Sequence, residues 1–419
     1  MGSAGIDAAK HGLLAIGIIL AVGSVCVSLA RTIKVPDVVV FLLAGLLLGP
    51  EVFGWIDVKA DSGFNQLILI FGSCYILFDG GASLRLKVLQ KVWITITLIA
   101  TVGVVITALL TGFVSHYILD IPFVAALLLG ATIASTDPAT LVPVFKQVKI
   151  KDRVAQTVMS ESAFNDATGA ILTFGILSVL MGKGEFELRA SLIDLLKQSG
   201  IGILAGAVLG YTAAFVIGHE KYSFLREHAP LVTLIAVVGA FLGADNLQAS
   251  GFMAVFVAGI VLGNKEIFGF NLARGGREKM DDFVATTALI VRMFIFLLLG
   301  SQVDFALVAN YFWSGVAVIL IFMFIVRPLV VLSCALPDRR AMWSFKELIF
   351  MCWTRETGVI PGALAGILLG MQAPYAEIIA AITFIAILMT ILIQATTTKW
   401  LAGKLGLLEE TPTRKPQLG

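Results

Sequence analysis

The chain has 419 residues, of which 58% are hydrophobic and only 14% are charged, and its mean hydropathy is +0.96. A soluble protein of this length needs far more polar surface, so the composition excludes a soluble fold and predicts a membrane protein with many spans. The formal net charge of +2 says little by itself, and we expect no nucleic-acid partner. Met1–His11 lacks the basic start and short apolar core of a secretion signal, so we expect no cleaved leader.

Stretches that are charged or rich in Pro or Gly divide the chain into thirteen apolar segments, each taken as a membrane-spanning helix. The fold class is therefore an all-α membrane protein, with residues 1–419 as one integral unit and a short cytoplasmic tail at 403–419. The expected segments are 12–30, 37–50, 64–82, 92–118, 122–146, 154–181, 196–218, 229–244, 250–264, 281–301, 309–334, 345–370 and 374–402.

Successive loops lie on alternate sides of the membrane in this arrangement, and the basic residues are concentrated on one side. Of the 30 Lys and Arg residues, 22 lie in the loops on one side and five in the loops on the other. Because cytoplasmic loops carry the excess of Lys and Arg, we expect the amino end outside and the carboxyl end in the cytoplasm. The predicted location is the cell (inner) membrane, crossed many times and surrounded by the lipid bilayer.

The fifth segment is interrupted by Thr136-Asp137-Pro138, and Pro143 follows. Proline removes a backbone donor and disfavours helical geometry in the residue before it, so this span is expected to be a broken helix. A simple proline kink without function is the alternative. Broken helices expose backbone groups and half-helix ends that transporters use to bind ions near the middle of the membrane.

The sixth segment holds two acids inside an otherwise apolar run. Glu161 and Asn165 are four residues apart, and so are Ser162 and Asp166, so all four fall on one broad helix face. An acid at membrane depth is costly and indicates a functional site. Oxygen ligands of this kind suit a hard cation such as Na⁺. The alternative is a capped helix start with both acids at a wetted end.

Three arginines lie within later segments, and each needs a partner or a water-filled cavity because arginine stays ionised. Arg327 precedes a proline and is the best candidate for a buried structural pair with Glu161, which leaves Asp166 as the exchangeable acid. Arg292 and Arg355 are possible accessory residues. Snorkelling to the membrane surface is the alternative for all three arginines, more so for Arg327 than for Arg292, which lies in the middle of its segment.

The twelfth segment contains a second break, Thr354–Gly362, seven spans after the first. Interrupted spans at corresponding positions of two halves predict inverted repeats with the binding site between them. Span six then corresponds to span thirteen, although the two halves share no convincing residue identity.

Asp137 and Asp166 are expected to meet near the middle of the membrane. Acids that repel each other in a low dielectric hold protons near neutral pH, and a cation that enters offers the alternative compensation. Competition between proton and cation for the same oxygens predicts an antiporter. Arg274-Gly275-Gly276-Arg277 is expected to be a flexible basic linker, and no P-loop pattern appears, so ATP coupling is not expected.

Four motifs resemble those of the NhaP-type sodium/proton antiporters, members of the monovalent cation:proton antiporter family. They are Ser-Thr-Asp-Pro-Ala-Thr at 135–140, Glu-Ser-Ala-Phe-Asn-Asp at 161–166, Arg327-Pro328 and Leu-Phe-Asp-Gly-Gly at 77–81. The resemblance covers nearly the whole chain. It implies a thirteen-helix fold, a homodimer and an elevator-like motion of a transport bundle (92–181 and 309–402) against a dimer or scaffold bundle (12–82 and 229–301).

The resemblance also implies the ligands of the transported Na⁺ or K⁺. Asp166 is then the cation- and proton-binding aspartate, and the other ligands are Glu161, Ser162, Asp137 and the Thr136 carbonyl. Asn165 belongs to the same cation- and proton-binding group.

Two further positions carry expectations from the resemblance. Asn165 implies electroneutral one-for-one exchange, because electrogenic relatives have a second aspartate there. The sequence departs from the family in the twelfth segment, where Glu356 follows Arg355. This extra acid either neutralises Arg355 or alters ion preference.

The expected function is therefore electroneutral Na⁺(Li⁺)/H⁺ antiport by a secondary transporter that is not an enzyme and needs no cofactor beyond its transported ions. A K⁺/H⁺ antiporter of the same fold is the alternative. More remote alternatives are an intramembrane aspartyl protease that uses Asp137 and Asp166, for which the usual companion motifs are missing, and a cation channel.

Overall fold

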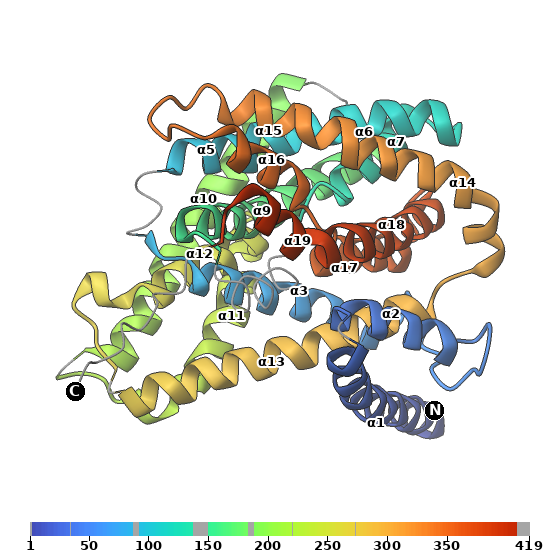
Figure 1. Ribbon diagram of the computed structural model, residues 1–419. Coiled ribbons are helices and arrows are strands. Elements are labelled where there is room, and N and C mark those ends of the chain that lie inside the picture. The colour runs from blue at the N-terminus through green and yellow to red at the C-terminus, as the bar shows by residue number, and fades with distance from the viewer. Residues whose placement is uncertain are drawn as a thin grey trace, which may run out of the picture.

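The computed structural model describes residues 2–33, 35–86, 92–136, 150–182, 188–219, 221–272 and 274–408. These residues form helices joined by short connections, and the one β-type contact among them is an isolated bridge between Ile150 and Leu408. The all-α fold class is confirmed. Figure 1 shows the helices in chain order.

Nine helical stretches of the described chain are long and apolar enough to cross a membrane, and four shorter apolar helices, α2, α7, α12 and α17, supply the other expected spans. The helices are α1 (Gly2–Ile33), α2 (Asp37–Leu48), α3 (Gly63–Ser83), α5 (Trp93–Leu98), η1 (Ile99–Gly103), α6 (Val104–Leu119), α7 (Phe123–Thr132), α9 (Asp152–Leu180), α10 (Leu188–Gly218), η2 (Arg226–His228), α11 (Ala229–Asn246), α12 (Gly251–Gly263), η3 (Lys265–Phe268), α13 (Arg274–Ser301), α14 (Phe305–Ile321), η4 (Phe322–Val326), α15 (Arg327–Ala335), α16 (Phe345–Trp353), α17 (Val359–Gly370), α18 (Ala376–Thr390), η5 (Ile391–Ala395) and α19 (Thr396–Leu405).

Three of the long spans contain a π-helical turn. η1 lies between α5 and α6, η4 between α14 and α15, and η5 between α18 and α19. A π turn inserts one extra residue into an α-helix and is frequent at functional sites. Arg327 is the first residue after η4.

The helices pack in groups that are far apart in sequence. One buried cluster joins α2, α3, α12 and α13, a second joins α6, α7, α14 and α18, and a third joins α15, α16 and the start of α9. Figure 1 shows α6, α14 and α15 on one side of the molecule, α1 and α13 on the opposite side, and α9 and α17 between them. This grouping is compatible with the two expected bundles, whose boundaries remain a prediction.

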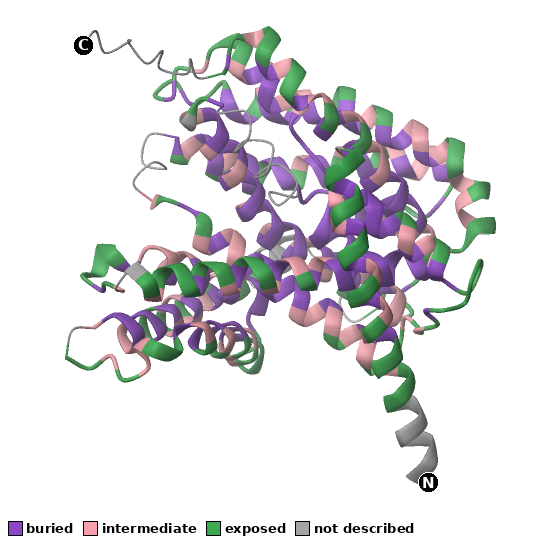
Figure 2. Ribbon diagram, turned by 60° about the horizontal axis from the view of Figure 1, so that its bottom comes forward, coloured by how far each residue is buried: buried purple, intermediate pink, exposed green. Residues whose placement is uncertain are grey.

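Burial separates the inner from the peripheral helices (Figure 2). In the most apolar window of α13, 61% of residues are buried inside the protein, compared with 28% for α1. Large apolar side chains such as Leu13, Leu14 and Val25 are exposed on α1. An apolar outer surface of this kind is typical of a multi-pass membrane protein.

The expected linker at 274–277 is wrong, because α13 begins at Arg274 and includes both glycines. Arg277 pairs with Glu266, and its Nε lies 3.9 Å from Asp281 Oδ2, one helical turn later. Charge pairs at this spacing support a helix that its glycines disfavour.

Candidate functional site

The first break lies where α7 ends and the chain turns against α9. The backbone N–H of Thr136 donates to Asn165 Oδ1 at 3.1 Å, and its hydroxyl donates to Ser162 Oγ at 2.8 Å. Asn165 Nδ2 in turn donates to Thr136 Oγ1 at 3.0 Å. Ser135 packs on Gly169, where any side chain would collide with the serine hydroxyl. Asp137, Pro138 and Pro143 lie outside the described residues.

The second break is the non-helical stretch Thr354–Gly358 between α16 and α17. The N–H of Thr357 donates to Thr390 Oγ1 on α18 at 3.0 Å. The two breaks are therefore stabilised in the same way. In each, a side chain of the following span accepts a hydrogen bond from a backbone N–H that lies outside any helix. Asn165 does this from span six and Thr390 from span thirteen, which are the spans expected to correspond.

Arginines cap the carbonyl ends of both half-helices. Arg355 Nη2 donates to the Ala134 carbonyl just beyond α7, and its guanidinium lies 4.2 Å from the Phe322 ring centre. Arg327 donates from Nε at 3.2 Å and from Nη2 at 2.8 Å to the Met351 carbonyl in α16. Helix carboxyl ends carry partial negative charge, so two buried cations compensate two dipoles that end inside the protein.

Arg327 also forms a two-pronged ion pair with Glu161. Its Nη2 lies 3.0 Å from Glu161 Oε2, and its Nη1 contacts Oε1. Arg327 is 3% exposed and Glu161 is 1% exposed. Paired donors of this geometry hold a carboxylate strongly, so Glu161 is engaged in structure and the snorkelling alternative for Arg327 is wrong.

Asp166 lies one helical turn after Ser162 and is 3% exposed. The capped helix start considered from the sequence is therefore wrong, since α9 begins at Asp152, nine residues before Glu161, and both acids are buried. The hydroxyl of Thr136, beyond the end of α7, meets the side-chain oxygens of Ser162 and Asn165 on the same stretch of α9, and such a set suits a hard cation.

The described residues contain no group of three His, Cys, Asp or Glu side chains placed to hold a metal ion. Asp137, a member of the expected cation ligand set, lies outside those residues.

Glu356 lies in the second break with no exposed surface. It is near enough to Arg327 and Arg355 to interact electrostatically with both. Two buried carboxylates, Glu161 and Glu356, and two buried guanidinium groups, Arg327 and Arg355, therefore interact at the second break. Arg292, by contrast, lies on α13, a helix that packs mainly on α2 and α3.

Three hydrogen-bond acceptors of the site could not be predicted from the sequence. The carbonyls of Ala134 and Met351 accept the arginines, and backbone acceptors have no sequence signature. Thr390 was missed because a threonine in an apolar helix usually bonds its own helix, as Thr390 also does with Ala386 O at 2.7 Å.

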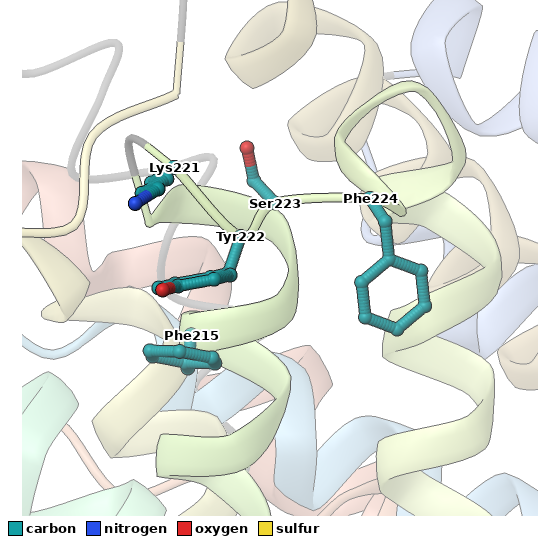
Figure 3. A pocket seen from close by; sticks show the side chains of 5 residues that line it. All are labelled: Phe215, Lys221, Tyr222, Ser223 and Phe224. Atoms are coloured by element: carbon teal, nitrogen blue, oxygen red, sulfur yellow. The ribbon is translucent and has the colours of Figure 1, made fainter.

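A hollow of about 630 Å³ lies at the α10–α11 connection, away from both breaks (Figure 3). Phe215 and Tyr222 stack with ring centres 6.3 Å apart, and Lys221 and Phe224 complete the wall. The described lining residues include no carboxylate, so this hollow does not suit a small cation.

Comparison with known proteins gives one consistent picture. The family model "Sodium/hydrogen exchanger, transmembrane" matches residues 17–404. The chain is 32% identical over 360 residues to Na⁺/H⁺ antiporter 1 of Methanocaldococcus jannaschii, which covers 84% of this chain and 81% of that relative. It is 30% identical over 369 residues to the K⁺/H⁺ antiporter NhaP of Alkalimonas amylolytica, covering 86% of this chain and 61% of the relative.

A solved structure has the same fold. The sodium proton antiporter MjNhaP1 from Methanocaldococcus jannaschii at pH 8 matches with a TM-score of 0.81 and 30% identity, over 94% of this chain and 98% of that one.

Proposed function

The chain belongs to the sodium/hydrogen exchanger family, and from this premise we propose that it exchanges Na⁺ or Li⁺ for H⁺ across the cell membrane as a secondary transporter. The observation that carries the proposal is a buried aspartate, Asp166, on the helix against which the first broken span is held. The oxygen-rich surroundings accept either a proton or a hard cation on this side chain, and the two compete.

The remaining acid and base groups leave Asp166 as the exchangeable site. The Arg327 guanidinium contacts both carboxylate oxygens of Glu161, so Glu161 is engaged in this ion pair. Asp166 then alternates between a protonated and a cation-bound state. Glu161, Asp137, Ser162 and the Thr136 carbonyl complete the proposed ligand set.

The transport cycle is proposed to be elevator-like. The bundle of residues 92–181 and 309–402 carries the site, and residues 12–82 and 229–301 form the scaffold of a homodimer. The distribution of Lys and Arg supports an external amino end and a cytoplasmic carboxyl end in the inner membrane. Similarity to relatives named as Na⁺/H⁺ antiporters supports the exchange of Na⁺ for H⁺ in this proposal.

K⁺/H⁺ exchange is the second candidate, because a relative named as a K⁺/H⁺ antiporter is nearly as similar, although the chain spans only 61% of its length. The family match lends no support to a protease or a channel.

Exchange in liposomes separates the two ions. We expect proton movement on addition of Na⁺ or Li⁺ with a half-saturating concentration several-fold below that for K⁺, measured with a pH-sensitive dye at several pH values. The reverse order identifies a K⁺/H⁺ exchanger. Cation flux without countermovement of protons contradicts antiport altogether.

Asn165→Asp tests the electroneutral stoichiometry. The aspartate loses the amide donor to Thr136 Oγ1, which costs about 1–3 kcal/mol when a buried group is left unsatisfied, so we expect exchange to slow roughly tenfold. If Asn165 alone sets the stoichiometry, the residual exchange becomes sensitive to an imposed membrane potential. Unaltered, voltage-independent exchange in this variant contradicts the role given to Asn165.

A further inference from the structure

Amide side chains tie together the outer ends of the proposed scaffold. Gln302, just after α13, donates to Asn65 Oδ1 at 3.0 Å, and Asn65 donates to the Ala60 carbonyl at 2.8 Å. Gln66 Nε2 donates to the same carbonyl at 2.8 Å. We call residues 57–66 together with Gln302 the outer rim. It lies at the external end of the spans in the proposed orientation.

Gln66 also reaches from the outer rim to α17 of the proposed transport bundle. Its Nε2 donates at 3.4 Å to the carbonyl of Gly366, a residue 300 positions away in sequence. A side chain at Gly370 would collide with this amide, and its Cβ would lie 2.6 Å from the Ala60 carbonyl. Gly370 therefore leaves the space that the Gln66 amide occupies.

The face of α17 that meets the scaffold is formed by three glycines at four-residue spacing. A Cβ at Gly366 would lie 2.6 Å from Leu69 of α3, and a Cβ at Gly362 would lie 3.0 Å from Leu299 of α13. Glycines on one helix face allow close approach without interlocking side chains. Along this smooth face, Gln66 supplies a directional polar contact.

Two hollows lie at the same boundary. One of about 770 Å³ is lined by Lys59, Asp61 and Tyr375, and one of about 160 Å³ is lined by Leu299, Gln302 and Asp304. Ala60 and Leu369 belong to both linings. The boundary between the outer rim and α17–α18 is thus hollowed in two places and bridged at Gln66.

We propose that Gln66 is a positioning residue of the exchange cycle, fastening the outer end of α17 to the scaffold and holding the outer path closed. The proposal rests on the proposed elevator-like antiport. Movement of the transport bundle breaks the contact with Gly366, while the contacts within the outer rim persist. Gln66 thereby sets the ratio of outward- to inward-facing molecules without contacting the ion.

Gln66→Leu tests this role, because leucine fills a similar volume and donates no hydrogen bond. Loss of one hydrogen bond shifts the conformational ratio by about threefold to tenfold. The apparent affinity for an ion scales with the fraction of molecules in the conformation that binds it. The half-saturating Na⁺ concentration on the outer side should therefore fall by that factor, while the value on the cytoplasmic side changes little or rises.

The measurement uses the full chain in liposomes with known orientation, and Na⁺ is titrated on one side at a time. Gln198→Leu, an exposed glutamine on α10, is the matched control and should leave both values unchanged. Gly370→Ala is the second variant. Its methyl group displaces the Gln66 amide, so it must shift the outer value in the same direction.

The outcomes separate the two proposals. An unaltered protein that exchanges no cation for protons refutes the proposed function. With exchange intact, an unchanged outer half-saturation value in either folded variant, or an equal change on both sides, overturns the role of Gln66.

Discussion

Asp166→Asn is expected to abolish cation/proton exchange, leaving liposomes that behave as if they held no protein. Asparagine has nearly the same shape as aspartate, but it carries no charge and accepts no proton near neutral pH. It therefore removes the alternation between proton and cation. Because the side chain keeps its shape and volume, we expect the melting temperature to change little. Exchange and thermal melting of the same preparation check both parts.

The matched control for this variant is Asp245→Asn, at an exposed position near the end of α11. It makes the same chemical change away from the breaks and should exchange normally. Full exchange by Asp166→Asn would remove this residue from the mechanism, and loss of exchange in both variants would point to an indirect cause.

Arg327→Ala is expected to impair folding as well as transport. The substitution strands Glu161, which is 1% exposed, and removes both donors from the Met351 carbonyl. An uncompensated charge in such a position costs about 3–5 kcal/mol. We therefore expect low yield in the membrane, early thermal unfolding in detergent, and no measurable exchange by what remains.

A double variant separates charge from packing. Glu161→Gln with Arg327→Met removes both charges and keeps most of the volume, and replacing both members of a buried pair is often nearly neutral. Its yield and melting temperature should recover most of what Arg327→Ala loses. Normal yield and normal exchange by Arg327→Ala alone would show that the ion pair is dispensable.

The sequence correctly predicted the spans and the start of the second break. The physical reasons lie in single residues. The second break follows Trp353 because a charged stretch interrupts an apolar run, and the structure leaves the helix there. The break ends at Gly358, earlier than the expected Gly362, because Pro361 fits the first turn of α17. Acids in the sixth span stood out because charge at membrane depth is rare. These signals are local, so they need no knowledge of packing.

What the sequence could not supply depends on contacts between distant elements. Thr390 and Gln66 are ordinary polar residues until the fold brings Thr357 and Gly366 beside them. The start of α13 was misjudged because adjacent glycines predict a linker, whereas Arg277 with Glu266 and Asp281 stabilises a helix. Tertiary contacts of this kind override local propensity.

The π-helical turn η4, which ends at Val326, has a consequence for the direction of the next side chain. Successive residues of an α-helix are spaced by about 100° around the axis. One extra residue therefore rotates everything that follows by about that angle relative to α14. If η4 were an ordinary α turn, with α14 packed as it is, the guanidinium of Arg327 would point away from Glu161. A single-residue deletion in this turn disconnects the ion pair while both of its members remain in the sequence.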